Sequence, residues 1–366
     1  MLVRNNYKEC ITNVACSIQK YFNVSNKHNS IVYLDKILEQ KKPKNVIAIL
    51  FDGMGSNIID RVLGENSFLV KHRIAKITTV FPATTVAALT AFETGLNPIE
   101  TGMLGWSMYY KGIDKIINVF RDTAKDDLEK IKLPEAHAFK EQNMLIPETV
   151  DLINNAGKYS AYKLYPFGDN AYENLEDMCN RIVDISKKGG TKFIYAYDDE
   201  PDHTLHSCGE GSQEVKDIIT ARCRAVEELA SRVEDSVIIV VADHGHLLTQ
   251  DIMIDDYPDI VNCLIRLPSM EPRATNFFVK PEKKKEFESL FNKYFAQWFK
   301  LYTVKEVLDS NLFGDGKVNQ VALDSLGDYI AIAVSNKALL TKYDKKLVSN
   351  HAGYTDDEIY IPLIVI

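Results

Sequence analysis

The stretch SVIIVVADHGH, residues 236–246, joins a continuous apolar run to a cluster of acidic and imidazole side chains. An apolar run of this kind is typical of a strand that is buried between helix layers in a parallel sheet. Similar runs, separated by helical patterns, recur at residues 45–51, 75–81, 160–165, 192–197 and 359–366. We therefore expect an α/β fold with a mostly parallel central sheet sandwiched by helices.

Residues 250–348 do not continue this alternation of apolar runs and helical patterns. Its own elements are two strand candidates and an amphipathic helix, at residues 273–279, 329–334 and 282–301. This mixture predicts a smaller inserted α+β cap that returns the chain to the main sheet. Residues 1–249 and 349–366 would then form the main domain, which is within the size that α/β domains reach.

The charge and composition of the chain argue against several classes of protein. A net charge of -8 and a pI near 5.6 argue against an extended nucleic-acid surface, which needs clustered Lys and Arg. The sequence has no run of about 18 apolar residues that would span a bilayer, and its N-terminus lacks the apolar core of a signal peptide. The six cysteines form no CxxC pair and indicate reduced thiols. We expect a cytoplasmic protein without membrane contact. The sequence does not determine its oligomeric state.

Acidic and imidazole side chains follow three of the predicted strands. They are, in chain order, Asp52, Asp202, His206, Asp243 and His244. The carboxyl ends of parallel strands meet at one edge of a sheet, so these groups should lie close together. Buried carboxylates repel one another unless a cation neutralises them, and a metal site is therefore expected. Mixed carboxylate and imidazole ligands suit Zn²⁺, with Mn²⁺ or Fe as alternatives.

Three further histidines are expected in the same region of the fold. His351 stands in a glycine-containing loop before the final predicted strand, which places it at the same edge as a further ligand candidate. His203 and His246 are close neighbours of the expected ligands. The sequence favours hydrogen-bonding roles for these two, because histidines next to metal ligands often orient the ligands rather than bind the metal.

The segment FPATTVAALTAFETG, residues 81–95, predicts a helix from Thr85 to Thr94 with Gly95 as its C-terminal cap. The helix start presents free N–H groups and a partial positive charge, which favour a bound phosphate. Thr84 and Thr85, at this helix start, are therefore candidates for a nucleophile, because a hydroxyl beside a divalent cation reacts at neutral pH. Plain N-capping by threonine is the alternative for this segment.

Five motifs, taken in order, resemble those of the alkaline phosphatase superfamily, and most closely its type I phosphodiesterase and nucleotide pyrophosphatase branch. They are FDGMG, FPATT followed by TGLNP, EPDHTLH, ADHGH and NHAGY, within residues 45–366. The resemblance implies an alkaline phosphatase-like catalytic domain with two zinc ions above the carboxyl edge of the sheet. One ion would be bound by Asp202, His206 and His351, and the other by Asp52, Asp243 and His244, with the Thr85 hydroxyl beside the second ion as nucleophile.

The resemblance further implies a phosphodiesterase or nucleotide pyrophosphatase that forms a phospho-threonine intermediate on a small phosphorylated substrate such as a nucleotide. The family's phosphodiesterases usually have an Asn where TGMLGWSMYY has Trp106, so the substrate preference stays open. Trp106, Tyr109 and Tyr110 are candidates for stacking on a planar group, with core packing as the alternative. A phosphomonoesterase, a phosphonate hydrolase and a phosphomutase of the same superfamily are the other enzymes to consider, and a non-catalytic metal-binding module is the alternative outside enzymes.

Overall fold

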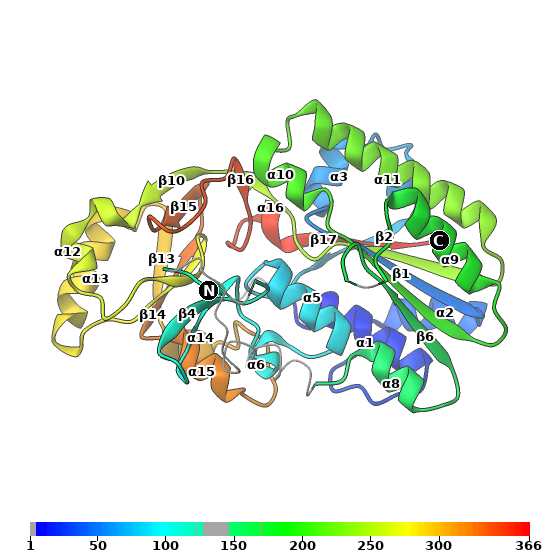
Figure 1. The fold of residues 1–366 in the computed structure, drawn as a ribbon, viewed down its shortest axis with the longest axis horizontal. Coiled ribbons are helices and arrows are strands. Elements are labelled where there is room, and N and C mark those ends of the chain that lie inside the picture. Colours follow the sequence, from blue (N-terminus) through cyan, green and yellow to red (C-terminus); the bar gives the residue numbers. More distant parts are fainter. Residues whose placement is uncertain (1–4, 122, 127–145, 169) are drawn as a thin grey trace.

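This computed structural model describes residues 5–121, 123–126, 146–168 and 170–366. Its central sheet has six strands in the order β2-β17-β8-β1-β7-β6. The strands are β1 Asn45–Phe51, β2 Arg73–Thr78, β6 Ser160–Leu164, β7 Lys192–Asp198, β8 Ser236–Val241 and β17 Tyr360–Val365. Each of them falls on one of the apolar runs that predicted a strand. Helices cover both faces of this sheet (Figure 1).

The register of the central strands determines where the functional side chains lie. β1 lies between β7 and β8 and is parallel to both, with Asn45 opposite Lys192 and Ser236. The three strands therefore end at the same edge of the sheet.

The last strand runs against this direction. β17 is antiparallel to both β8 and β2, so the parallel direction predicted for the final run is wrong. The physical reason is the path of the chain, because Leu363 of β17 pairs with Val241 at the carboxyl end of β8. The loop that contains His351 lies at this edge, so β17 enters the sheet where β8 leaves it.

Two helix layers enclose the sheet (Figure 1). One layer contains α1 Ile11–Tyr21, α2 Val32–Lys41, α5 Thr85–Thr94 and α8 Thr149–Asn155. The other contains α3 Ser56–Val62, α4 Phe68–His72, α9 Leu175–Ser186, α10 Asp202–Cys208 and α11 Gln213–Arg232. Strands and helices share one apolar core that includes Ile47, Ile239 and Leu363. The strands are covered on both faces, which explains why their sequences are apolar throughout.

A second sheet of seven strands, in the order β13-β14-β12-β11-β3-β4-β5, is formed by described residues at the other end of the molecule (Figure 1). Its strands are β3 Ser107–Tyr110, β4 Lys115–Asn118, β5 Thr123–Ala124, β11 Ser269–Glu271, β12 Ala274–Phe277, β13 Phe299–Thr303 and β14 Tyr329–Ala333. Residues 250–348 supply β11 to β14, whereas β3 to β5 come from residues 107–124, which the sequence did not assign to this sheet. The domain boundaries themselves stay a prediction.

The remaining helices and short strand pairs complete this region. The helices are α6 Pro98–Thr101, α12 Pro258–Val261, α13 Lys284–Phe295, α14 Val304–Asp309, α15 Gln320–Leu326 and α16 Asp356–Ile359. Helix α13 ends before the predicted residue 301, because the chain turns after Phe295 and enters β13 at Phe299. The two-stranded pairs are β10 Gln250–Met253 with β15 Lys337–Leu340, and β9 Leu247–Leu248 with β16 Ser349–Asn350.

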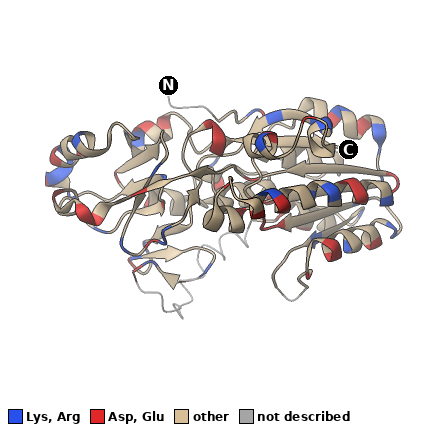
Figure 2. Cartoon of the chain, turned by 90° about the horizontal axis from the view of Figure 1, so that it is seen from above, with Lys and Arg blue, Asp and Glu red and all other residues tan. Residues whose placement is uncertain are grey.

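Basic and acidic side chains intermix along the outer helices instead of separating onto different faces (Figure 2). In α11, for example, Lys216 and Arg224 alternate with Asp217 and Glu228. Within the described part of the chain, each helix is too short or too polar to cross a membrane.

Candidate metal centre

Asp52, Asp243 and His244 converge at the carboxyl edge of the sheet. Asp52 directly follows β1, and Asp243 and His244 follow β8 in a loop, as predicted. The three side chains are buried, and one ligand atom of each lies within 4.8 Å of the others. His244 Nε2 lies 3.4 Å from Asp52 Oδ1 and 3.5 Å from Asp243 Oδ2. Ligand atoms around a tetrahedral zinc ion lie about 3.3 Å apart, so this spacing fits a metal ion.

A second group lies beside the first and contains Asp202, His206, His246 and His351, again with ligand atoms within 4.8 Å of one another. Asp202 and His206 lie one turn apart on α10, as the sequence predicted. The two groups are in contact, because the His351 and His244 rings stack with centroids 3.9 Å apart. The structure thus brings together all six side chains that the resemblance assigned to metals, and it adds His246.

Backbone carbonyl groups orient three of the imidazole rings. His206 Nδ1 lies 2.8 Å from the carbonyl oxygen of Ser349, His351 Nδ1 lies 3.1 Å from that of Ala83, and His244 Nδ1 lies 3.2 Å from that of Gly245. A carbonyl oxygen only accepts hydrogen bonds, so each Nδ1 must carry the proton. In the neutral ring, Nε2 then presents its lone pair, which is the form in which histidine binds a metal.

The electrostatics of the first group favour a bound cation. Asp243 Oδ2 is buried and has no hydrogen-bond partner among the described residues. Burial, together with the neighbouring carboxylates of Asp243 and Asp202, raises the pKa of Asp52 well above its usual value. A divalent cation would pair with the orphaned oxygen and remove this repulsion, so the donor set fits a metal ion.

The second group offers neutral imidazole rings as ligands. Burial lowers the pKa of His246 to about 4, and burial followed by the nearby His244 lowers that of His351 well below its usual value. Both rings are therefore uncharged near pH 7, which leaves them free to bind a cation.

Thr85 is the first residue of α5 and faces the first group. Its hydroxyl oxygen lies 3.2 Å from His244 Nε2 and 3.5 Å from Asp52 Oδ1. Both distances are close to the separation between ligand atoms around a tetrahedral zinc ion. Thr85 is partly exposed, whereas Thr84 and Val86 beside it are buried. The helix ends at Thr94 with Gly95 in the left-handed conformation, as predicted.

Thr84 precedes the helix but does not cap it with its side chain. Its hydroxyl instead donates a 2.7 Å hydrogen bond to Oε1 of Glu271, on β11 of the second sheet. The same oxygen accepts a 2.7 Å hydrogen bond from the backbone N–H of Trp106. Glu271 therefore joins the start of α5 to the backbone of Trp106. The sequence did not reveal this contact, because Glu271 lies far from every motif.

Other residues considered from the sequence lie outside both groups. His203 is exposed on α10. Tyr109 is buried, its hydroxyl donates a hydrogen bond to Asp114, and its ring packs against Phe278. It therefore belongs to the packing of the second sheet. Trp106 is 36% exposed and lies against Phe120 and Arg121, which leaves part of its ring open to solvent.

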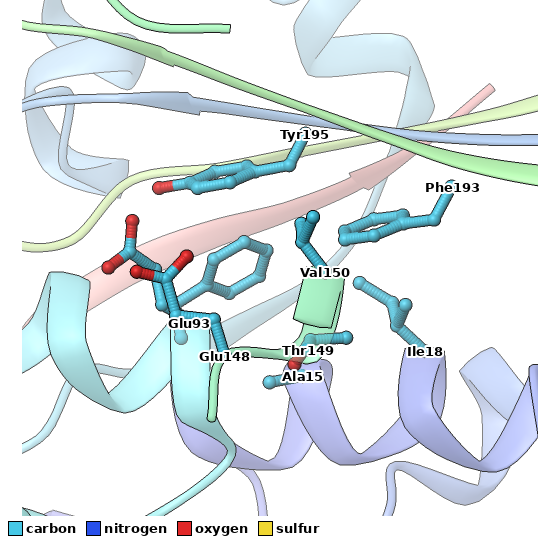
Figure 3. A pocket seen from close by; sticks show the side chains of 9 residues that line it. Ala15, Ile18, Glu93, Glu148, Thr149, Val150, Phe193 and Tyr195 are labelled. Carbon is cyan, nitrogen blue, oxygen red and sulfur yellow. The ribbon is translucent and has the colours of Figure 1, made fainter. Parts of the chain in front are cut away.

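A small internal cavity lies away from this centre, between α1, α5, α8 and β7 (Figure 3). Its volume of about 10 Å³ holds at most a single water molecule. Ile18, Val150, Phe193 and Tyr195 are among the residues that line it. The cavity is too small for a substrate.

The sheet order, the two helix layers and the paired acid–imidazole groups define an alkaline phosphatase-like hydrolase fold. The solved structure of murine ectonucleotide pyrophosphatase / phosphodiesterase 5, an inactive variant with AMP, matches it with a TM-score of 0.64 and 17% identity over 87% of each chain. Phosphonoacetate hydrolase from Sinorhizobium meliloti 1021, with phosphonoformate, has a TM-score of 0.63 and 16% identity, over 88% of this chain and 90% of that chain. The search of curated proteins found no match.

The sequence profile of the family "Type I phosphodiesterase / nucleotide pyrophosphatase" matches residues 46–351. The chain therefore belongs to this family, and it is a phosphoester hydrolase. The matched range begins in β1 and ends at His351, so it includes Thr85 and both acid–imidazole groups. The family resemblance and the fold class expected from the sequence are confirmed.

Proposed function

We propose that this chain is a phosphodiesterase or nucleotide pyrophosphatase that uses Thr85 as nucleophile and two zinc ions as cofactors. The observation that carries the proposal is the position of the Thr85 hydroxyl, 3.2 Å from His244 Nε2 at the start of α5. One ion would be held by Asp52, Asp243 and His244, and the other by Asp202, His206 and His351. Mn²⁺ and Fe are the alternatives that this donor set also accepts.

The residues of the site suggest a reaction in two displacements. Thr85 loses its proton to solvent, and its oxygen attacks the phosphorus while the ester oxygen leaves and takes a proton from solvent, which gives a phospho-threonine and a free alcohol. A water molecule then attacks the same phosphorus and releases Thr85 with the phosphate product. The free N–H groups at the start of α5 stabilise negative charge on the phosphoryl oxygens. Bound divalent cations would lower the pKa of the attacking hydroxyl and neutralise the oxygen that leaves.

The charge of the site supports the need for cations. Asp52, Asp243 and Asp202 place three carboxylates where a phosphate must bind, and they would repel it unless positive charge intervenes. The cations would therefore serve both to hold the site together and to admit the substrate.

The nature of the leaving group is the finer part of the proposal. The murine neighbour was solved as an inactive threonine-to-alanine variant with AMP, which supports a nucleotide-like substrate. The partly exposed ring of Trp106 offers a stacking surface for a base. The phosphonoacetate hydrolase neighbour, which has a nearly equal TM-score, makes a C–P bond the second candidate.

A substrate panel on the zinc-loaded protein tests this proposal. We expect faster hydrolysis of a bis-aryl phosphate diester than of a mono-aryl ester or of phosphonoacetate. Thr85→Ala should lower turnover on the order of 10³-fold or more while the zinc content stays unchanged, and Thr85→Ser should retain part of the activity. Wild-type turnover in Thr85→Ala would reject the nucleophile, and a metal-loaded protein inactive on the whole panel would indicate a non-catalytic metal-binding module.

Three further observations support the proposed location, substrate class and domain organisation. The six cysteines, all within the described residues, are free, and Cys208 is exposed, which supports a reducing, cytoplasmic location. Mixed surface charge supports a small phosphorylated substrate and not a nucleic acid (Figure 2). The contact from Glu271 to Thr84 supports residues 250–348 as a cap on the catalytic domain.

A further inference from the structure

A buried ion pair links the second sheet to the loops of the metal centre. Arg273 lies in the turn between β11 and β12, and Glu358 lies in α16, directly before β17. Both side chains are completely buried. Arg273 Nε donates a 2.6 Å hydrogen bond to Glu358 Oε1, and Arg273 Nη2 donates a 2.8 Å hydrogen bond to Glu358 Oε2. The guanidinium and the carboxylate therefore meet through two hydrogen bonds, which fix their relative orientation.

The remaining donors of Arg273 bind the second sheet and its neighbouring strand. Nη1 donates a 2.6 Å hydrogen bond to the carbonyl oxygen of Lys337, and Nη2 donates a 2.8 Å hydrogen bond to that of Ser335. The backbone carbonyl of Arg273 accepts a 2.9 Å hydrogen bond from the N–H of Ala333. Ala333 ends β14 and Lys337 begins β15, so Arg273 is anchored on both sides of this turn.

The Glu358 side chain holds the loop that contains His351. Its Oε1 atom accepts a 2.6 Å hydrogen bond from the N–H of Gly353, two residues after His351, and its Oε2 atom accepts a 2.7 Å hydrogen bond from the hydroxyl of Thr355. A Cβ atom at Gly353 would lie 2.8 Å from Arg273 Nη2 and from both carboxylate oxygens of Glu358. The loop therefore packs directly against the ion pair.

The Glu358 backbone reaches the other acid–imidazole group. Its carbonyl oxygen accepts a 2.9 Å hydrogen bond from the N–H of Gly245, which stands between His244 and His246. Glu358 thus contacts the His351 loop through its side chain and the His244 loop through its main chain. These two loops supply ligand candidates to different groups of the metal centre.

We propose that Arg273 is a positioning residue for the metal centre, which acts through Glu358 to hold the loops of His351 and His244 in place. The inference rests on the proposed function, because it presupposes that these histidines bind metal ions. Well-packed apolar side chains often stabilise a protein as well as a buried ion pair does, so stability alone is a weak reason for the pair. Its fixed geometry suits the orientation of neighbouring loops. The second sheet then supports the metal ligands from outside the catalytic domain.

Arg273→Lys tests this role because it keeps the positive charge beside Glu358 and removes the planar fork. A lysine ammonium cannot reproduce both bonds to Glu358 together with those to Ser335 and Lys337. We expect zinc affinity, measured by competition against a chromogenic chelator, to weaken about 10-fold to 100-fold. The cadmium NMR resonances of the cadmium-loaded protein should shift at the same time, because the geometry around each bound ion changes.

The matched control is Lys192→Met, which removes another buried cation. Lys192 begins β7, at the edge of the sheet opposite the metal centre, and its ammonium donates to the Asn45 side chain and to the Gly190 carbonyl. The loss of these buried hydrogen bonds should lower Tm. Zinc affinity and the cadmium resonances should stay as in the wild type. This control separates a loss of stability from a loss of ligand position.

The outcomes distinguish the inference from the proposed function. If Arg273→Lys matches Lys192→Met in zinc affinity and in its cadmium resonances, Arg273 only stabilises the fold and the inference is wrong, while the proposed function stands. If the wild-type protein binds no zinc, the proposed function fails and the inference fails with it.

Amide hydrogen exchange of the wild-type protein provides a test that does not require Arg273→Lys to fold. Zinc should slow the exchange of Gly353 and Gly245, and also that of Ala333, whose N–H is bonded to the Arg273 carbonyl. Slower exchange at Ala333 supports the link through Arg273. Protection confined to the two glycines would overturn it.

Discussion

The hydroxyl of Tyr197 donates a 2.5 Å hydrogen bond to Oδ2 of Asp52, while the other oxygen of Asp52 faces the Thr85 hydroxyl. Burial raises the pKa of Tyr197 well above its usual value, so the phenol keeps its proton and always donates. The backbone carbonyl of Tyr197 in turn accepts a hydrogen bond from Tyr172. Tyr197 therefore fixes the orientation of the carboxylate that is proposed to bind the ion next to the nucleophile.

Removing this hydroxyl should weaken metal binding at one site. In Tyr197→Phe, Asp52 loses a partner that orients it, so we expect zinc affinity at the Thr85 site to fall about 10-fold to 100-fold. Competition against a chromogenic chelator measures this change. Tyr21→Phe, which removes a hydroxyl bonded to the Pro43 carbonyl instead, is the control and should bind zinc as the wild type does. Equal affinities in both variants would show that Tyr197 does not support the site.

Chelation should destabilise the protein as well as inactivate it. Without cations, the buried carboxylates of Asp52 and Asp243 lie together uncompensated. Free zinc at about 100 times its dissociation constant stabilises a folded protein by about 2.7 kcal/mol per site. We expect calorimetry to show a lower Tm after chelation, recovered by added zinc, and Asp243→Asn to lose most of this response. A Tm that is indifferent to chelator and zinc would contradict a metal centre.

The strand ends explain how much of the site was predictable. Parallel strands that end at one edge bring Asp52 and Asp243 together whatever the details of packing, and one helical turn joins Asp202 to His206. These relationships follow from local periodicity and from the rules of parallel sheets. They explain why ligand candidates far apart in the sequence were placed at one edge before their contacts were known.

Long-range pairing lay beyond the sequence. Ser107 in the SMYY strand pairs with Met270, more than a hundred residues away, and nothing in the strand's own sequence indicates this pairing. The strands that this segment contributes to the second sheet were therefore not predicted. The direction of β17 was missed because apolar content does not encode strand polarity. Glu271 and Tyr197 were missed because their hydrogen bonds depend on this tertiary arrangement.

Glu271 should make stability depend on pH. Burial raises its pKa to about 7, although hydrogen bonds from Thr84 and Trp106 oppose the shift. The folded protein thus binds this proton more tightly than the unfolded chain, whose Glu has a pKa of about 4.3, so the contribution of Glu271 to the free energy of unfolding falls as pH rises between these values.

Glu271→Gln tests this dependence because its side-chain oxygen accepts the same two hydrogen bonds and cannot ionise. The variant should gain stability relative to the wild type from pH 5 to pH 8, by an amount on the order of 3 kcal/mol. Urea unfolding of the zinc-loaded proteins at each pH measures the difference. The exposed Glu65 provides the control, since Glu65→Gln should track the wild type at every pH. A constant offset between Glu271→Gln and the wild type would place the pKa of Glu271 in its ordinary range.

Gly245, between His244 and His246, should tolerate no side chain. A Cβ atom there would lie 2.0 Å from the backbone carbonyl oxygen of Asp357, which cannot rotate away as a flexible side chain would. We expect Gly245→Ala to lower the free energy of unfolding by about 3 kcal/mol and to weaken zinc binding, because relief of the clash moves the adjacent imidazoles. Gly211→Ala meets no atom within 4 Å and serves as the control in the same urea and zinc titrations. Zinc affinity in Gly245→Ala equal to that of Gly211→Ala would show that this loop does not need its close contact with Asp357 to present the ligands.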